Sequence, residues 1–128
     1  LVGSEMCIRD RRYLGALQGR PVSEIRHLSS NADQNNAGIE TVEQVATRAL
    51  TAIEEIAQRH VGAKVLIVAH GGTISILLQH LLGMHPGSPA NFRIRNTSCS
   101  VVDVRVEGGR VEDVTVQSMG CVAHLEAH

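Results

Sequence analysis

The sequence predicts a protein of the α/β class, in which helices pack on a sheet of buried strands. Three observations carry this prediction: apolar residues recur at helical spacing over 42–60, a continuous β-branched and apolar run covers 65–69, and a second apolar segment covers 73–83. The glycine pair Gly71-Gly72 stands between the apolar run and the second segment. Helix, buried strand, tight turn and helix in this order are typical of α/β sheet proteins.

The first helix has a start signal in the sequence. Thr41 and Gln44 form a capping-box pattern, in which Thr41 accepts from the Gln44 amide and Gln44 reaches back to the backbone of Thr41. The residues at helical spacing behind it are Val42, Val45, Ala46, Ala49, Ile53, Ile56, Ala57 and His60. Because charged residues lie elsewhere in the segment, we expect a long amphipathic helix. These residues are Glu43, Arg48, Glu54, Glu55 and Arg59.

The run Val65–Ala69 is too short for a helix and is typical of a strand that is buried on both faces. The next segment, TISILLQHLLG, predicts a second helix with stop signals at Gly83, Pro86 and Gly87. Upstream, the polar stretch 20–38 predicts one or two helical turns followed by a loop.

The region after Ser98 predicts a β-hairpin. Valines cluster on both sides of Gly108-Gly109, and a Gly-Gly pair suits the tight turn between two antiparallel strands. The valines are Val101, Val102, Val104 and Val106 before the turn, and Val111, Val114 and Val116 after it.

The composition argues against several classes of partner. Twelve Lys and Arg against 13 Asp and Glu give a net charge of −1 without a basic stripe, so we expect no nucleic-acid partner. No apolar run approaches the roughly 20 residues of a membrane helix, so we expect no membrane partner. Cys99 and Cys121 make no CxxC pattern, which indicates neither a disulfide framework nor a zinc knuckle. We interpret both as small buried hydrophobic residues and expect a reducing, cytoplasmic location.

The opening stretch LVGSEMCIRD is too short and too charged for a signal peptide. Codons that encode it residue for residue resemble a transposon-end adapter used in sequencing libraries. We therefore expect residues 1–10 to be an adapter-derived artefact and residues 11–128 to be the C-terminal part of a single domain. The alternative is a genuine flexible N-terminus.

The stretch VLIVAHGGTI carries the main functional signal. His70 stands where the predicted strand ends, and ligands of open α/β sheets collect at the carboxyl ends of strands. Gly71 and Gly72 let the backbone turn into a helix whose first N–H groups suit an anion such as phosphate. A histidine at this place can donate to a phosphoryl oxygen. The alternative is a His70 that only caps the strand beside two sterically required glycines.

Two other interpretations of the histidines find little support. An HGG loop also forms the oxyanion hole of α/β-hydrolases, but the G-x-S-x-G motif that this fold needs does not occur. His80 and His85 are five residues apart across the end of a helix, so they do not share a face as metal ligands do. We expect no metal site.

The order of motifs resembles the C-terminal part of the histidine phosphatase superfamily, which has the phosphoglycerate mutase-like fold. The residues that carry the resemblance are VLIVAHGG, RNTSCSVVDV and CVAHL, preceded by RRYLGALQGRPVSEI and GIETVEQVATR, in one colinear order from about Arg12 to Leu125. The resemblance implies a three-layer α/β/α sandwich with a mostly parallel sheet, truncated at its N-terminus.

The resemblance also implies which parts of the chemistry lie elsewhere. The family's nucleophile is the histidine of an Arg-His-Gly motif, which does not occur in this sequence. A second phosphate-binding arginine lies upstream in the family, and Arg11 stands where the family has a proton-donating Glu. We infer that this Glu was cut away at the junction rather than replaced, whereas Gln18 stands where the family usually has Glu.

The residues that match the family's site are few. His70 is expected to contact the phosphoryl group and to stabilise the charge that develops on its oxygens. Gly71 and Gly72 would bind phosphate with it, and His124 would lie at the rim of the pocket. For Asn96 and Ser98, side-chain-to-backbone hydrogen bonds at the start of a strand are a sufficient explanation.

The resemblance implies phosphomonoester hydrolysis through a phosphohistidine, on a small phosphorylated substrate and without a metal or organic cofactor. Mutase members of this family resemble one another in a long insertion before the strand that ends in His-Gly and in a non-glycine after it. Here the link from Gly19 to Glu40 is short and Gly72 follows Gly71, so the resemblance favours a phosphatase over a mutase. The stretch from Tyr13 to Arg26 and the C-terminal hairpin resemble members that act on sugar bisphosphates. The alternatives are mutase-type phosphoryl transfer and a non-catalytic relative that binds phosphate or protein.

Overall fold

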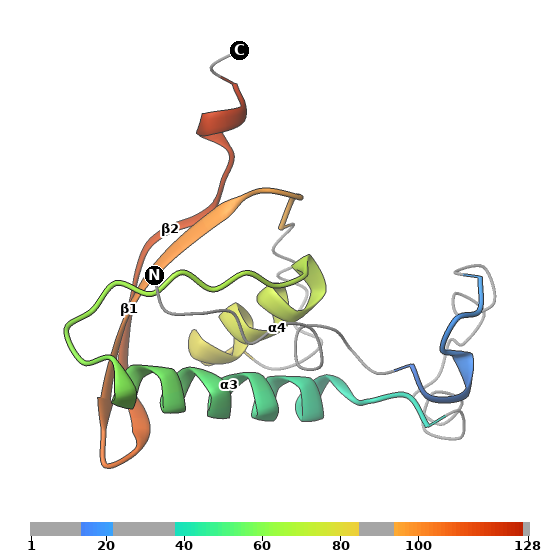
Figure 1. Ribbon diagram of the computed structural model, residues 1–128, viewed down its shortest axis with the longest axis horizontal. Helices are drawn as coiled ribbons and strands as arrows, with labels where there is room; N and C mark the ends of the chain where they lie inside the picture. Colours follow the sequence, from blue (N-terminus) through green and yellow to red (C-terminus); the bar gives the residue numbers. More distant parts are fainter. Residues whose placement is uncertain (1–13, 22–37, 85–93, 127–128) are drawn as a thin grey trace.

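The computed structural model describes residues 14–21, 38–84 and 94–126. Its elements, in chain order, are η1 (Gly15–Leu17), α3 (Val42–Arg59), α4 (Gly71–Leu81), β1 (Cys99–Glu107), β2 (Arg110–Cys121) and η2 (Ala123–Leu125), as Figure 1 shows. Both predicted helices and the predicted hairpin are confirmed. Most of the polar stretch 20–38, and the stop signals Pro86 and Gly87, fall outside the described residues.

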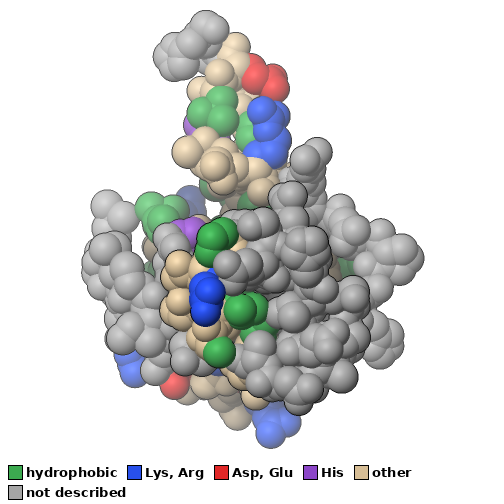
Figure 2. All heavy atoms as spheres, turned by 90° about the vertical axis from the view of Figure 1, so that its right-hand side faces the viewer, with side chains coloured by type: hydrophobic (Ala, Val, Ile, Leu, Met, Phe, Trp, Pro, Cys, Tyr) green, Lys and Arg blue, Asp and Glu red, His purple; other side chains and the backbone are tan. Residues whose placement is uncertain are grey.

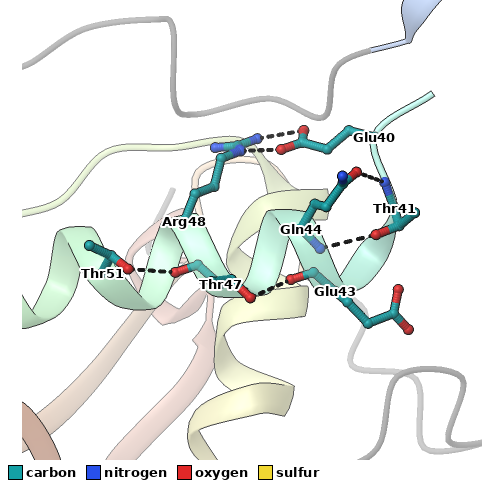
Figure 3. Close-up of polar contacts among 7 residues, drawn as sticks. All are labelled: Glu40, Thr41, Glu43, Gln44, Thr47, Arg48 and Thr51. Atoms are coloured by element: carbon teal, nitrogen blue, oxygen red, sulfur yellow. Dashed lines mark hydrogen bonds and ion pairs between the residues drawn. The ribbon is translucent and has the colours of Figure 1, made fainter. Parts of the chain in front are cut away.

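The start of α3 has the predicted capping box. Thr41 Oγ1 accepts from the Gln44 amide N at 3.1 Å, and Gln44 Oε1 accepts from the Thr41 amide N at 2.8 Å (Figure 3). These two bonds satisfy backbone donors that have no acceptor within the helix. The helix ends at Arg59, and Gly62 follows with a φ of +74°.

The core of the described part lies where α3 packs against α4, with β1 crossing α3 (Figure 1). Its buried residues are Ile39, Val45, Ala46, Ala49, Thr73 and Leu78. Three of them come from the apolar stripe predicted for α3. Among the described residues, no helix is both long and apolar enough to cross a bilayer.

The strands β1 and β2 form an antiparallel hairpin whose turn is Gly108-Gly109. The φ angles of these glycines, +58° and +81°, are both positive, as a two-residue type I′ turn requires. The register shifts three times along the ladder, and β2 has 12 residues against nine in β1. One hydrogen bond ties the hairpin to α3, because Glu54 Oε1 accepts from the Val111 amide N at 3.1 Å.

The run Val65–Ala69 differs from its prediction as a strand buried on both faces. It pairs with no other strand among the described residues, and Leu66, Ile67 and Val68 are 62%, 47% and 82% exposed. A central strand is buried only when neighbouring strands and helices cover it, and no described segment does so. The described part contains a two-stranded antiparallel sheet, and the three-layer sandwich with a parallel sheet stays a prediction.

The prediction that both cysteines are buried is wrong. Cys99 and Cys121 are exposed free thiols at the open end of the hairpin. The alternation of valines correctly predicts strands, but it does not show which face of the hairpin the helices cover. In β1 the face toward the helices carries Val102, Val104 and Val106, which are less exposed than their neighbours along the strand.

Candidate functional site

His70 is the residue that precedes the first turn of α4. Its backbone is extended, with φ −91° and ψ 149°, and its carbonyl oxygen accepts the first helical bond from the Ile74 amide N at 3.0 Å. The imidazole is exposed and makes no capping hydrogen bond to the helix. Its nitrogens are therefore not used in closing the first turn, where Ser, Thr or Asp would normally place an oxygen.

The start of α4 has the features of an anion site. The N–H groups of its first turn have no acceptor within the helix, and the helix dipole makes this end partly positive. The first turn holds no acidic residue that would oppose an anion. His70 thus stands beside backbone donors that suit the oxygens of a phosphate group.

The two glycines after His70 have different surroundings. A Cβ at Gly71 would lie 3.2 Å from the carbonyl oxygen of Ile94, so glycine lets the segment before β1 approach the helix start closely. A Cβ at Gly72 would meet no described atom within 4 Å. Neither has a positive φ, so the turn into α4 does not need the left-handed region.

His124 lies in η2, which follows the end of β2, and its side chain is exposed. In Figure 1 η2 stands well away from α4, and in Figure 2 the same end of the chain projects above the rest of the molecule. The structure does not bring His124 and His70 together. A place for His124 at the rim of a phosphate pocket stays a prediction.

The segment that leads into β1 departs from its prediction. Ser98 Oγ is buried and has no hydrogen-bond partner in the described part of the chain, so the expected side-chain-to-backbone bond is not made there. The neighbouring Thr97 instead donates to the carbonyl oxygen of Asn96 at 2.6 Å and has a φ of +60°.

Sequence reasoning missed an ion pair between Glu40 and Arg48. Arg48 Nε lies 2.5 Å from Glu40 Oε1, and Arg48 Nη2 donates to Glu40 Oε2 at 3.1 Å (Figure 3). The Glu40 side chain is 15% exposed and the Arg48 side chain is 24% exposed. From its sequence position alone, Glu40 is an acidic residue next to the start of α3, where the helix dipole favours a negative charge. An acid and an arginine eight positions apart do not form a recognisable helix pattern, so no sequence signal predicts the contact.

An open groove runs beside this ion pair. Its lining residues are Gly38, Glu40, Glu43, Gln44, Thr47, Arg48, Thr51 and Glu55. Three of these are carboxylates, and Arg48 already binds one of them. The charge of the groove therefore disfavours a phosphate, which leaves the start of α4 as the better anion site. The described residues hold no cluster of three side chains that could bind a metal ion.

Comparison with known proteins defines the class of the chain. Residues 10–117 match the histidine phosphatase superfamily (branch 1), so the chain belongs to this superfamily. Among solved structures, Bacillus stearothermophilus YhfR superposes with a TM-score of 0.69 at 28% identity, over 91% of this chain and 61% of that one.

Curated relatives carry phosphoglycerate mutase names. The chain is 31% identical over 87 residues to the probable phosphoglycerate mutase GpmB of Yersinia enterocolitica, covering 68% of this chain and 40% of the relative. It is also 31% identical over 125 residues to phosphoglycerate mutase-like protein 4 of Arabidopsis thaliana, covering 90% of this chain and 51% of the relative. The chain thus spans about half the length of these relatives.

Proposed function

We propose that the parent protein of this chain hydrolyses a phosphomonoester, with His70 contacting the phosphoryl group. The observation that carries the proposal is the position of His70 beside the first turn of α4, in a chain of the histidine phosphatase superfamily. The substrate phosphate would lie between the imidazole and the backbone N–H groups at Gly71 and Gly72.

The proposed role of His70 is electrostatic. During attack at phosphorus, negative charge develops on the phosphoryl oxygens, and a fixed donor at the end of α4 stabilises this charge without reorganisation. The nucleophile is a different histidine, because the 128 residues contain no Arg-His-Gly motif. We propose that it belongs to the parent protein outside this chain and forms the phosphohistidine that water then hydrolyses. No metal or organic cofactor is required.

We propose hydrolysis rather than phosphoryl transfer, on a small phosphorylated metabolite such as a sugar bisphosphate. The short connection between Gly19 and Glu40, and a glycine at position 72, support the phosphatase. A phosphoglycerate mutase is the second candidate, because the curated relatives carry that name. A relative that binds phosphate without turning it over is the third. We place the protein in the cytoplasm.

The experiment uses the full-length parent protein, recovered from an unfragmented gene. Release of inorganic phosphate from an aryl phosphate and a sugar bisphosphate is measured beside the interconversion of 2- and 3-phosphoglycerate. Phosphate release supports the phosphatase, and interconversion supports the mutase. Neither reaction, in a parent without an Arg-His-Gly motif, would indicate the non-catalytic relative.

The contribution of His70 is tested by His70→Ala in the same protein. Loss of one preorganised donor is expected to lower kcat by about 10²–10³-fold. The control is His80→Ala, because His80 is exposed at the opposite end of α4 and is expected to leave kcat unchanged. Circular dichroism confirms that each variant is folded. A folded His70→Ala variant with near wild-type kcat would remove His70 from the mechanism.

A further inference from the structure

Cys99 and Cys121 lie directly opposite each other in the ladder of the hairpin, as its outermost pair. Directly opposed residues of antiparallel strands project from the same face of the sheet. Both side chains are exposed and both are free thiols. The register thus places two thiols side by side at a surface that small molecules reach.

The backbone spacing of such a pair fits a disulfide. Opposed Cα atoms of antiparallel strands are about 4.5 or 5.5 Å apart, depending on the type of pair, and disulfides span about 4.4–6.8 Å between Cα atoms. Their Cβ atoms, about 4.5–5.5 Å apart, need only a small approach to the separation of about 3.8 Å that a disulfide prefers.

The local backbone allows this small approach. A register shift separates the Cys99–Cys121 pair from the next pair, Val101 and Ser118, so the outermost pair is not held in a regular ladder. Gly120, with a φ of +60°, directly precedes Cys121. Its amide N donates to Ser100 Oγ at 2.9 Å, which keeps the two strands together beside the cysteines.

We propose that Cys99 and Cys121 form a reversible cross-strand disulfide in exchange with a low-molecular-weight disulfide such as oxidised glutathione. The thiolate of one cysteine attacks a glutathione sulfur, forms a mixed disulfide and releases one glutathione. The second cysteine then attacks the protein sulfur of this bond and releases the second glutathione. The protein loses two electrons and two protons, and glutathione disulfide is reduced to two thiols.

The position of the bond determines what it restrains. Cys99 begins β1, directly after the segment whose Ile94 carbonyl approaches Gly71, and Cys121 ends β2 shortly before η2. Oxidation therefore ties the segment that contacts the start of α4 to the segment that carries His124. Because the bond is exposed, reductants reach it, as in labile regulatory disulfides.

The test uses the full 128-residue chain with Cys7→Ser, so that only these two cysteines remain. The protein is equilibrated in glutathione redox buffers, quenched with acid, alkylated and analysed by mass spectrometry, in native buffer and in urea. We expect an intramolecular disulfide. In native buffer, the effective concentration of one thiol at the other should exceed the roughly millimolar value of a flexible chain. In urea, where the hairpin is lost, this effective concentration should fall at least about tenfold.

The control moves one thiol out of register. In Cys121→Ser/Thr115→Cys the new thiol is at an exposed position of β2 that pairs with Asp103, so it does not face Cys99. This variant is expected to accumulate glutathione adducts in native buffer. Three results would each overturn the proposal. The first is an equal effective concentration in native buffer and in urea, and the second is a control variant that forms its internal disulfide equally well. The third is a protein with Cys99 and Cys121 that forms glutathione adducts or disulfide-linked dimers in place of the internal bond.

Discussion

Glu40 closes onto Arg48 through two hydrogen bonds, so the residue before the cap of α3 is tied to the body of the helix (Figure 3). The pair lies directly beside the capping box of Thr41 and Gln44. Two independent sets of bonds therefore fix the direction in which the chain enters α3, which supplies three of the six buried residues of the described core.

Removing one partner of this ion pair is expected to destabilise the protein. In Glu40→Gln or Arg48→Met, the ion pair is lost while the remaining side chain stays mostly buried, which costs about 1–3 kcal/mol of unfolding free energy. The matched control is Arg105→Met. Arg105 Nη1 lies 3.6 Å from Glu107 Oε2, but the two side chains are 65% and 74% exposed, so this ion pair is expected to add little stability. Urea unfolding of the parent protein measures the effects. An equal loss of unfolding free energy in the Glu40–Arg48 variants and in Arg105→Met would contradict a stabilising role for the Glu40–Arg48 pair.

The two glycines at the start of α4 are expected to respond in opposite ways to alanine. Gly71→Ala brings a Cβ to 3.2 Å from the Ile94 carbonyl oxygen, and the required shift is expected to cost about 1 kcal/mol. Gly72→Ala enters open space and is expected to gain a few tenths to about 1 kcal/mol from helix propensity. Thermal unfolding of both variants measures the two changes in stability. A loss of stability in Gly72→Ala as large as that in Gly71→Ala would be inconsistent with this geometry.

The exposed run Val65–Ala69 is expected to make the 128-residue chain associate. Unpaired strand-like segments rich in apolar residues are templates for pairing with another chain. Sedimentation velocity at about 100 µM is expected to show oligomers that Leu66→Lys and Val68→Lys reduce. Val61→Lys is the control, since Val61 is 86% exposed but precedes the run. A monomeric wild-type chain would contradict this prediction.

The opening residues LVGSEMCIRD are expected to be absent from the genomic copy of the gene, because their codons resemble a sequencing adapter. Amplification from genomic DNA across the junction at Arg11 tests this directly. Recovery of those codons in place would show that the stretch is native.

The features that the sequence predicted correctly depend on residues close together in the chain. The capping box needs only Thr41 and Gln44, and the hairpin turn needs only Gly108-Gly109 between two runs of valine. The position of His70 before α4 follows equally from the local order of apolar run, glycines and apolar helix.

The features that it missed depend on residues distant in the chain. Burial of Val65–Ala69 requires neighbouring strands, and the exposure of Cys99 depends on which face of the hairpin α3 covers. A common pocket for His70 and His124 likewise depends on residues distant in the chain, so it is expected only through the resemblance to a family and stays a prediction. The Glu40–Arg48 pair depends on how the chain enters the helix rather than on a spacing rule.

The uneven lengths of β1 and β2 give the hairpin an asymmetric tolerance to insertion and deletion. The extra residues of β2 are taken up at the register shifts. Deleting one of them would convert a bulge into regular ladder and leave every side chain of β1 on its present face. Deleting one residue of β1 would instead turn Val102 and Val104 away from the helices, because side chains alternate along a strand. Evolution can therefore change the length of the hairpin through β2 while β1 keeps its length.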